Sequence, residues 1–483
     1  MSKNSPTYLA FDLGWSSSRV ILGWLSGENC DCIEIEELYR FDTPRTTEQG
    51  ELYWNLETLW QKLNEGLSIA LNSNPNVCSL SVDSWGFDYV PLNAQGNRLR
   101  NAYCYRSPRT ENARDWVFDG INESSLYEAT GIQFLEFNTL CQVMADQQQE
   151  LDLPENRLMM ADYFNYCFAQ QTQDAAVSEV SLVSTSGLLD VHNLDAPSWS
   201  IGVMNQLGIP AQSWPQIVQS GTIIGSVNDH PSINVIASCS HDTACAVAAV
   251  PVAPNSPTWA YLSCGSWSLL GVERDAPITT EGARQANFTN EVGLDGTIRF
   301  LTNLTGLWVL QECQHQPEWE HLWVRGECDE FDYDTLLQEA SNADNFDIAI
   351  DFNAPSFQNP DNMITAIRNY CHQEGLPVPE SPGELARIIF YSLASSYQTA
   401  LSLLEIIINE QIEILHIVGG GAQNYLLCQL VANVCQRQVV AGPTEATTLG
   451  NLLIQARTMG HLPTNVSIRE VVINSTDLTI YYP

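Results

Sequence analysis

Apolar and polar positions follow two recurring patterns along the chain, one typical of strands and one of helices. At 8–25 (YLAFDLGWSSSRVILGWL) and at 259–273 (WAYLSCGSWSLLGVE), an apolar run is followed by a short Gly/Ser stretch and a second apolar run. Each segment predicts two β-strands joined by a tight turn. Because one hairpin opens each half, the pattern favours a duplicated domain. Two unrelated hairpins are the alternative.

Strands and helices alternate after both hairpins. In the first half we expect two strands within 77–97 and a helix within 158–171. The second half predicts, in order, helix 382–411, strand 412–420, helix 423–436, strand 437–442 and helix 445–460. This alternation is typical of an α/β protein. A Pro-rich join at 251–257 predicts an N-terminal domain, 1–250, and a C-terminal domain, 251–483.

Composition excludes several classes of function. The chain has 483 residues, 44% hydrophobic and 16% charged, as folded domains do. With 20 Lys and Arg against 57 Asp and Glu, the formal net charge is −37, which repels nucleic acids and anionic membranes. No stretch is long and apolar enough to cross a bilayer, and the N-terminus does not resemble a signal peptide. We expect a cytoplasmic protein whose 14 cysteines are reduced thiols.

The turn of the first predicted hairpin carries a sequence suited to phosphate. In FDLGWSSSR, Asp12 ends a strand and is followed by Gly14 and three serines, whose amides and hydroxyls can line one concavity. Asp12 is placed to hold Mg²⁺, directly or through water, and Arg19 to reach a phosphate. An ordinary hairpin with a capping Asp is the alternative. SCGSWS, at 263–268, offers the same groups in the second half.

Three consecutive glycines separate a predicted strand from a predicted helix in VGGGAQN, at 418–424. Gly419 and Gly421 fit the dinucleotide-binding fingerprint, but Asn424 stands where its last glycine belongs. The glycines either let an adenine or a ribose approach the backbone closely or form a plain tight turn. Both interpretations stay open from the sequence.

SVDSWGFDYVPLN, at 81–93, places Asp83 and Asp88 on either side of Trp85 and Gly86. Carboxylates accept hydrogen bonds from sugar hydroxyls, and an aromatic face packs against sugar C–H groups. This pattern predicts a sugar site. A core position is the alternative for Trp85.

YCYRSPRT, at 103–110, adds Arg106 and Arg109, which are scarce positive charges in an acidic chain. We expect one of them to line the same pocket or to pair with a nearby carboxylate.

ASCSHDTACAVAAVP, at 237–251, puts Asp242 directly before small apolar residues. This pattern predicts the first turn of a buried helix, where the helix dipole and free amides favour a negative charge and lower the carboxylate pKa. Asp242 is therefore a helix cap or a functional carboxylate. Cys239, His241 and Cys245 also suggest zinc, but no second ligand pair with metal spacing accompanies them.

Eight motifs, taken together and in order, resemble the FGGY carbohydrate kinases. They are FDLGWSSSR, VDSWGFDYV, YRSPRT, SHDTACAVAAVP, YLSCGSWSLLG, NEVGLDGTIRFLTNLTGLWVLQE, IVGGGAQNYLLCQLVANV and AGPTEATTLGN, between about residue 8 and about residue 460. Within the family they are most similar to the branch that phosphorylates L-rhamnulose. The resemblance implies two ribonuclease-H-like domains of the actin and hexokinase type with a central cleft. It also implies ATP and Mg²⁺ as cosubstrates and transfer of the γ-phosphoryl to a ketose hydroxyl, giving L-rhamnulose 1-phosphate.

The resemblance further implies roles for individual residues. Asp242 would be the catalytic base, and Asp12 would hold the metal ion. Sugar contacts are implied for Gly86, His241 and Thr243, with Asp83, Trp85, Asp88 and Arg106 nearby. ATP contacts are implied for Gly14, Trp15, Ser16, Ser17, Ser18, Arg19, Gly265, Ser266, Asn303, Gln311, Gly420, Gly421 and Asn424.

Several positions depart from the family's pattern. Ser18 and Val292 stand where Gly is common, and Ser266 stands where Thr is common. Ser107 and Pro108 replace an acidic residue and a Ser. Because position 107 is near the expected sugar pocket, the identity of the sugar stays open.

Alternative functions also stay open. The chain can be a kinase for xylulose, ribulose, fuculose or a polyol, a sugar sensor without turnover, or a chaperone-type or filament ATPase. Asp12 and Asp242 argue against the sensor, and the sugar-site motifs argue against the ATPases. A homodimer is common among such kinases.

Overall fold

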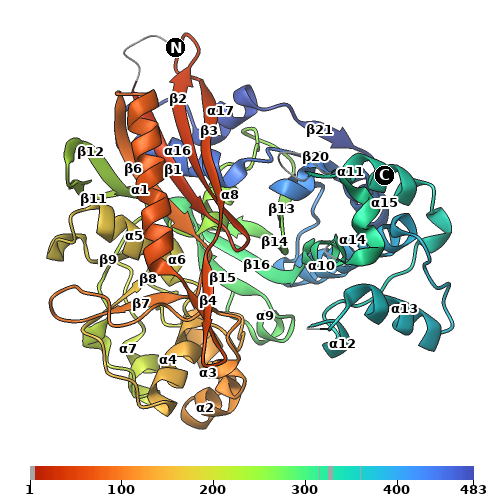
Figure 1. The fold of residues 1–483 in the computed structure, drawn as a ribbon, viewed down its shortest axis with the longest axis horizontal. Helices are drawn as coiled ribbons and strands as arrows, with labels where there is room; N and C mark the ends of the chain where they lie inside the picture. The colour runs from red at the N-terminus through yellow and green to blue at the C-terminus, as the bar shows by residue number, and fades with distance from the viewer. Residues whose placement is uncertain (1–5, 315, 325–329, 359) are drawn as a thin grey trace. The chain divides into compact units, whose positions relative to one another are not determined.

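The computed structural model describes residues 6–314, 316–324, 330–358 and 360–483 (Figure 1). These residues form an α/β protein that divides into two compact units. Unit 1 takes in the described residues up to Ala253, together with Glu273–Leu301 and Ala446–Thr476. Unit 2 comprises Pro254–Val272, Thr302–Glu445 and Asp477–Pro483. The domain boundary expected at 250/251 stays a prediction. Two expectations concern residues outside the described ranges. Residues 1–5 belong to the N-terminus that we expect not to be a signal peptide, and Cys328 is one of the cysteines that we expect to be reduced.

Unit 1 is built on a six-stranded sheet of order β11-β12-β6-β1-β2-β3. Its strands are β1 (Thr7–Leu13), β2 (Ser17–Ser26), β3 (Cys32–Asp42), β6 (Val77–Ser84), β11 (Thr222–Val227) and β12 (His230–Ala237). Strand β1 pairs antiparallel with β2 and parallel with β6, which pairs parallel with β12. All of β1 is buried, as a strand covered on both faces must be.

Helices cover both faces of this sheet. In Figure 1, α1 (Leu56–Ser73) lies in front of the sheet and α16 (Ala446–Thr458) behind it. A Cβ added at Gly66 of α1 would meet Val20, whereas one at Gly23 would meet Leu452 of α16. Positions 20 and 23 point to opposite faces because side chains alternate along a strand. The further helices α5 (Met160–Phe168) and α8 (Asp242–Ala248) contact β6 and α16, respectively.

Unit 2 repeats the same sheet plan. Its strands lie in a seven-stranded sheet of order β15-β16-β14-β13-β19-β20-β21, whose edge strand β15 (Thr289–Val292) pairs antiparallel with β16. They are β13 (Trp259–Cys264), β14 (Trp267–Arg274), β16 (Ile298–Thr305), β19 (Ile414–Val418), β20 (Gln438–Ala441) and β21 (Thr479–Tyr481). Strand β13 pairs antiparallel with β14 and parallel with β19, as β1 does with β2 and β6. Both predicted hairpins are therefore confirmed.

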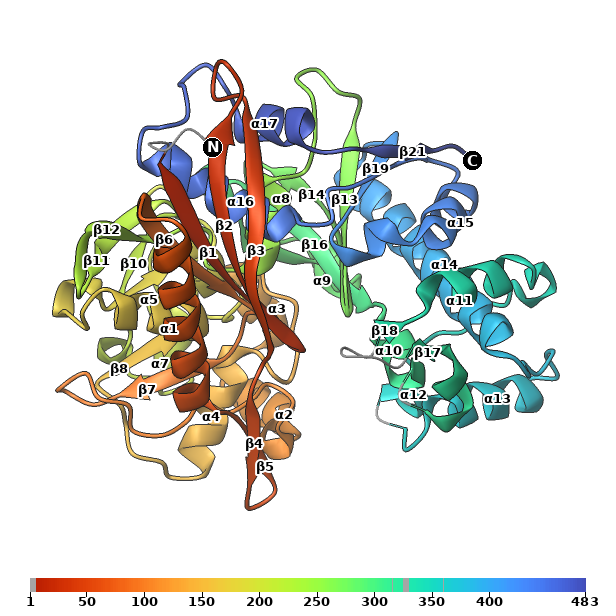
Figure 2. The ribbon, with the colours of Figure 1, turned by 45° about the horizontal axis from the view of Figure 1, so that its top comes forward.

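The helices expected in the second half are also present. The long one is α14 (Pro382–Ile408), which begins at a capping box formed by Ser381 and Glu384. It ends where Asn409 adopts a left-handed conformation (φ 54°). Figure 2 shows α15 (Tyr425–Cys435) beside α14, with which it packs. Both helices end within a few positions of the predicted ranges, because capping and turn residues determine where they begin and end.

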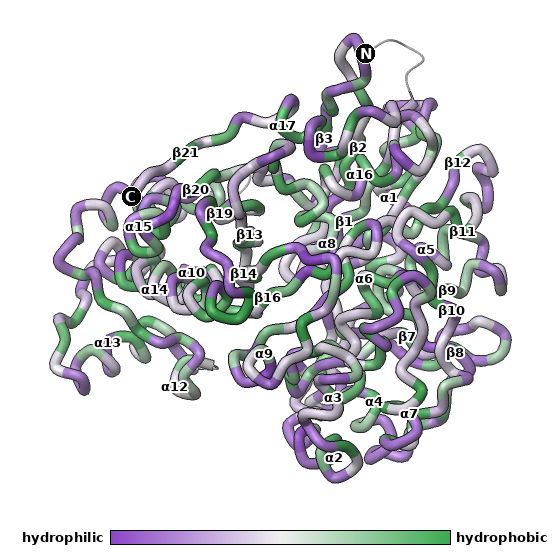
Figure 3. The backbone as a smooth tube through the Cα atoms, turned by 180° about the vertical axis from the view of Figure 1, so that it is seen from behind, coloured by the Kyte–Doolittle hydropathy of each residue, from purple (hydrophilic) through white to green (hydrophobic). Residues whose placement is uncertain are grey.

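The remaining elements of unit 1 are β4 (Arg45–Glu48), β5 (Glu51–Trp54), β7 (Tyr89–Leu92), α2 (Ala113–Gly120), α3 (Glu123–Thr130), α4 (Thr139–Gln148), β8 (Asn156–Met159), β9 (Val177–Glu179), α6 (Val180–Val183), α7 (Ile201–Gln206), β10 (Gln216–Val218), α9 (Glu281–Gln285), β15 (Thr289–Val292) and α17 (Ile468–Ser475). Those of unit 2 are α10 (Trp308–Gln314), β17 (Trp323–Val324), β18 (Glu330–Phe331), α11 (Tyr333–Ser341), α12 (Pro355–Gln358) and α13 (Met363–Gln373). In Figure 3, hydrophilic stretches predominate in outer loops such as those around α2. Among the described residues, no helix combines the length and the apolar character needed to span a membrane.

Candidate active site

Three parallel strands of unit 1 end at one edge of its sheet, and polar residues follow each of them. The register of β1 and β6 pairs Asp12 with Asp83. Beyond the end of β12, His241 bridges in parallel to Ser84, which directly follows Asp83. Asp242 then begins α8. The topology thus gathers three carboxylates at the carboxyl ends of the strands, where α/β proteins usually bind ligands.

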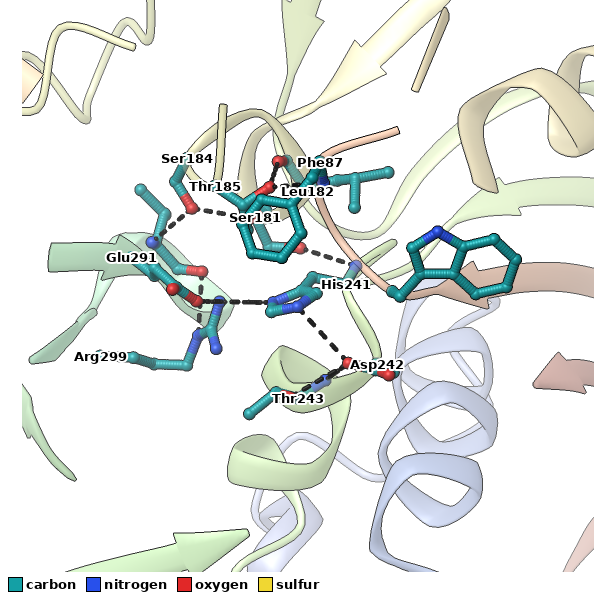
Figure 4. A network of polar contacts seen from close by, with 12 residues as sticks. Phe87, Ser181, Leu182, Ser184, Thr185, His241, Asp242, Thr243, Glu291 and Arg299 are labelled. Carbon is teal, nitrogen blue, oxygen red and sulfur yellow. Dashed lines mark hydrogen bonds and ion pairs between the residues drawn. The ribbon is translucent and has the colours of Figure 1, made fainter. Parts of the chain in front are cut away.

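The side chain of Asp242 is held through one of its two oxygens (Figure 4). Oδ1 accepts hydrogen bonds from the backbone N–H of Thr243 at 2.5 Å and from its hydroxyl at 3.0 Å. The same oxygen lies 3.4 Å from Nε2 of His241. Oδ2 makes no hydrogen bond or ion pair with any residue that the structure describes, and 31% of the side chain is exposed. One oxygen is therefore fixed and the other is available to accept a proton.

The pKa of Asp242 is raised to about 7, first by burial and then by the charge of Asp12. The helix N-terminus predicts a lowered pKa, and that prediction is wrong. Helix α8 has seven residues, and burial together with a neighbouring carboxylate outweighs its dipole. At neutral pH the carboxyl group is therefore partly protonated. A general base is most effective when its pKa lies near the pH of the reaction, as it does here.

Charged side chains lie near both nitrogens of the His241 ring (Figure 4). Arg299 donates from Nη2 to Nδ1 of His241 at 3.0 Å, and the same Nη2 lies 3.1 Å from Oε2 of Glu291. The backbone N–H of His241 donates to the hydroxyl of Ser181 at 3.2 Å. Burial, followed by the charge of Arg299, lowers the pKa of His241 well below its usual value. The imidazole is therefore neutral at physiological pH.

Asp83 is fully buried behind this edge of the sheet. Its Oδ2 accepts a hydrogen bond from Asn451 of α16 at 2.5 Å, whereas its Oδ1 has no hydrogen-bond partner among the described residues. Burial, then the charge of Asp12, raises the pKa of Asp83 well above its usual value. The contact expected between Asp83 and a sugar stays a prediction.

Asp88 supports an aromatic cluster rather than standing free. Its Oδ2 accepts hydrogen bonds from the indole N–H groups of Trp54 at 2.6 Å and Trp85 at 2.9 Å. Its Oδ1 accepts one from Gln142 at 2.7 Å. The two indole rings lie 4.0 Å apart, and Trp85 is buried. A sugar hydroxyl would have to replace one of these donors to reach Asp88.

Gly86 leaves no room for a side chain. An added Cβ would lie 2.8 Å from the hydroxyl oxygen of Thr185. The next residue, Phe87, has a φ of 78°, which is strained for a bulky residue. Its carbonyl accepts a hydrogen bond from Thr139 at 2.6 Å.

The two arginines of the YRSPRT motif have different surroundings. Arg109 is buried and pairs with Asp146 at 2.6 Å. Arg106 is exposed, and its guanidinium lies 4.6 Å from the ring centre of Trp15. Arg45 also lies over that ring, at 4.4 Å. Arg106 is therefore the arginine that a ligand can reach.

The first Gly/Ser turn is closed by a hydrogen bond from the N–H of Gly14 to the carbonyl of Ser17, at 3.2 Å. Trp15 and Ser16 lie within this turn, and Asp12 pairs with Arg19 at 2.5 Å. Mg²⁺ usually takes one or two carboxylates and fills its shell with phosphate oxygens and water. Asp12 and the unpartnered oxygen of Asp83 fit that donor set. Within the described parts of the chain, no group of three or more His, Cys, Asp and Glu could hold a metal unaided.

Three departures from the family pattern have partners inside unit 1. Ser18 shares a hydrogen bond with the hydroxyl of Thr43 at 2.8 Å. Ser107 donates to the carboxylate of Glu51. Val292 is buried, and its N–H donates to the hydroxyl of Ser184 at 2.9 Å.

Gly265 and Ser266, two of the predicted nucleotide residues of unit 2, form a second tight turn. The N–H of Gly265 donates to the carbonyl of Trp267 at 2.8 Å, and Ser266 donates to Oε1 of Gln311 at 2.9 Å. Asn303 lies in β16. Asn424 caps α15, and its side chain accepts a hydrogen bond from the N–H of Leu427 at 2.9 Å.

Each of the three glycines after β19 is in a different structural environment. Gly419 has a φ of 84°, which glycine adopts readily. A Cβ at Gly421 would lie 2.2 Å from the sulfur of Cys264. A Cβ at Gly420 would meet no heavy atom within 4 Å beyond its chain neighbours. The turn conformation thus explains Gly419, close packing against Cys264 explains Gly421, and Gly420 leaves an open side for a ligand.

Sequence reasoning missed several residues that build this site. Glu179 is a fully buried carboxylate that accepts the N–H of Ser240 at 2.9 Å and thereby holds the loop before His241. Glu291 and Arg299 lie in the NEVGLDGTIRF motif, for which the resemblance implies no role at these two positions. The sequence signal that could reveal such residues is a charged residue within an otherwise apolar strand. A charged side chain that is buried must be paired with another polar or charged group.

Comparison with known proteins agrees with this architecture. The N-terminal domain of the "FGGY family of carbohydrate kinases" matches residues 7–248, and the C-terminal domain matches residues 260–459. The rhamnulokinase of Bacillus subtilis is 35% identical over 99% of this chain and 95% of its own. That of Pectobacterium atrosepticum is 38% identical over 98% of this chain and 92% of its own.

Solved structures share the fold. A ligand-bound xylulose kinase from Lactobacillus acidophilus superposes with a TM-score of 0.77 at 14% identity, covering 99% of this chain and 94% of that one. A glycerol kinase from Plasmodium falciparum with ADP gives a TM-score of 0.73 at 11% identity, with the same coverage. The two family domains and the full-length similarity together show that the chain belongs to the FGGY family of carbohydrate kinases.

Proposed function

We propose that this sugar kinase transfers the γ-phosphoryl group of ATP to a hydroxyl of a ketose, and that the ketose is L-rhamnulose, giving L-rhamnulose 1-phosphate. The observation that carries the proposal is the arrangement at Asp242. One oxygen is held by Thr243, the other is free, and the pKa is raised to about 7. Full-length relatives named rhamnulokinase, at 32–38% identity, support the choice of sugar.

In the proposed step, Oδ2 of Asp242 accepts the proton of the attacking sugar hydroxyl. The sugar oxygen forms a bond to the γ-phosphorus as the bond from that phosphorus to the β–γ bridging oxygen breaks, and ADP leaves. Phosphoryl transfer depends mainly on positioning and electrostatics, so the held carboxylate contributes by its fixed direction. His241 and Thr243 are proposed to contact the sugar, with Gly86 and Arg106 beside them.

ATP is proposed to contact the two Gly/Ser turns and the glycine turn after β19. The backbone amides around Gly14 and Gly265 are the main donors, since the net charge of −37 opposes a polyanion at long range. Mg²⁺ would be held at Asp12 and, when bound, would neutralise charge on the phosphates. Release of Asp12 from Arg19 would free that arginine for a phosphate oxygen.

The test is an ATP-consumption assay with purified protein over L-rhamnulose, L-fuculose, D-xylulose, D-ribulose, glycerol and gluconate. The proposal predicts that kcat/KM is highest for L-rhamnulose and that the product carries phosphate on its primary hydroxyl. A higher kcat/KM for another member of the panel would assign that sugar instead. Binding of a sugar without turnover of any would favour a sensor.

A further inference from the structure

The contact between Arg299 and His241 determines which ring nitrogen of the histidine carries the proton. A guanidinium has only N–H donors, so its hydrogen bond of 3.0 Å to Nδ1 requires a lone pair on that nitrogen. The neutral ring must then carry its hydrogen on Nε2. Nε2 lies 3.4 Å from Oδ1 of Asp242, at the side of the ring where the sugar is expected.

Arg299 itself is held in one orientation. Its side chain is fully buried, its Nε donates to the carbonyl of Val292 at 3.3 Å, and its Nη2 lies 3.1 Å from Glu291. Glu291 is also buried and lies 3.6 Å from Nδ1 of the histidine. A buried carboxylate beside a buried guanidinium balances its charge. The three side chains thus form one network of contacts, and His241 joins it to Asp242 (Figure 4).

We propose that Arg299 is a positioning residue that fixes His241 in its Nε2–H tautomer, so that His241 offers the sugar a hydrogen-bond donor and never a base. This inference rests on the proposed function, because it assumes a sugar beside Asp242. Two consequences follow. Asp242 is left as the base of the pair, and the sugar must place an oxygen with a free lone pair, a carbonyl or a hydroxyl, against Nε2. A sugar with hydrogen or methyl at that position would leave this N–H with only Oδ1 of Asp242, 3.4 Å away, as an acceptor.

The tautomer can be measured without any sugar. Nuclear magnetic resonance of the enzyme labelled with ¹⁵N-histidine separates Nε2–H, Nδ1–H and doubly protonated rings, and the His241→Gln variant identifies the His241 signals. We expect a neutral Nε2–H ring at about pH 7. A ring protonated on Nδ1 or on both nitrogens would overturn the proposal. Because no substrate is present, this outcome is independent of which sugar the kinase uses.

The kinetic test compares Arg299→Met with Arg157→Met. Arg157 is an equally buried arginine of unit 1 that bonds to Ser213 and has no contact with His241 or Asp242. For Arg299→Met we expect mixed tautomers of His241, a kcat lower by roughly 10- to 100-fold and an ATP KM within about 2-fold of wild type. For Arg157→Met we expect a lower Tm with kcat nearly retained. Equal kcat losses in the two variants, or an unchanged tautomer in the first, would contradict the positioning role.

Removing Arg299 alone leaves Glu291 buried without its partner, which can prevent folding. The double variant Arg299→Met with Glu291→Met removes both charges and keeps the measurement possible. We expect this variant to fold and still to show mixed tautomers and the reduced kcat. Wild-type kcat in the folded double variant would also overturn the proposal. A wild-type enzyme inactive on every sugar would reject the proposed function but leave the tautomer measurement standing.

Discussion

At the scale of single residues, the site depends on three carboxylates that come from distant parts of the sequence and influence one another. Asp12 raises the pKa of both Asp83 and Asp242, although burial is the larger cause in each case. Asp83 stays inside the fold, whereas Asp242 keeps one oxygen free. The same chemical group thus serves as support in one place and as a candidate base in the other.

The pH dependence of the reaction follows from the pKa of Asp242. The base form exists above that pKa, so kcat/KM for the sugar should fall about tenfold per pH unit below about pH 7 and level off above it. Steady-state rates across the pH range measure this. Burial also raises the pKa of Asp88 to about 7, so Asp88→Asn is the control and should keep the same inflection. An inflection near the ordinary aspartate pKa would contradict this assignment.

The raised pKa also carries a cost in stability. Folding keeps a proton on Asp242 that the unfolded chain releases at its ordinary pKa, so the folded state loses stability as pH rises through that window toward about 7. We expect Asp242→Asn to increase the free energy of unfolding by about 1–2 kcal/mol at about pH 8 and by less at about pH 5. Urea denaturation at both pH values measures this. Asp275→Asn, at an exposed position, is the control and should change the free energy of unfolding little at either pH. An Asp242→Asn protein less stable than wild type at about pH 8 would refute the assignment.

At the scale of elements, the glycine turn after β19 packs against Cys264 of β13, and two of its glycines test this packing. Gly421→Ala should destabilise unit 2 by about 1–3 kcal/mol, because its methyl group would meet the sulfur of Cys264. Gly420→Ala is the matched variant and should keep the stability, since the space beside it is open. If ATP approaches this turn, Gly420→Ala should raise the ATP KM. Thermal unfolding and kinetics of both variants measure these effects. Equal stability losses would contradict the packing difference.

Local patterns also explain how much of the fold the sequence could predict. The hairpins, α14, β19, α15 and β20 are recognisable because periodicity, caps and turn residues are encoded within each segment. The hydrogen bond between His241 and Arg299 joins residues 58 positions apart, and no local pattern indicates it. The direction of the Asp242 pKa was missed for the same reason, since it depends first on burial in the fold and then on Asp12, which lies in a distant strand.

At the scale of the whole molecule, charge is the dominant feature. A net charge of −37 destabilises the compact state by self-repulsion, which salt screens. We expect Tm to rise by several degrees between about 0.02 and about 0.3 M NaCl at neutral pH. The effect should shrink near the isoelectric point of about 4.3, where the net charge vanishes. Calorimetry at both pH values measures this, and a salt effect of equal size at both would exclude self-repulsion as its cause.

The central claim is that the free carboxylate oxygen of Asp242 accepts the proton of the sugar hydroxyl. The most direct measurement compares wild type with Asp242→Asn, which keeps the size and the Oδ1 acceptor but removes the basic oxygen. Sugar phosphorylation is followed as product formation and ATP affinity by equilibrium binding. The account predicts a kcat reduced by roughly 10²- to 10⁴-fold with ATP affinity nearly unchanged. An Asp242→Asn enzyme that phosphorylates its sugar at a rate near wild type would contradict it.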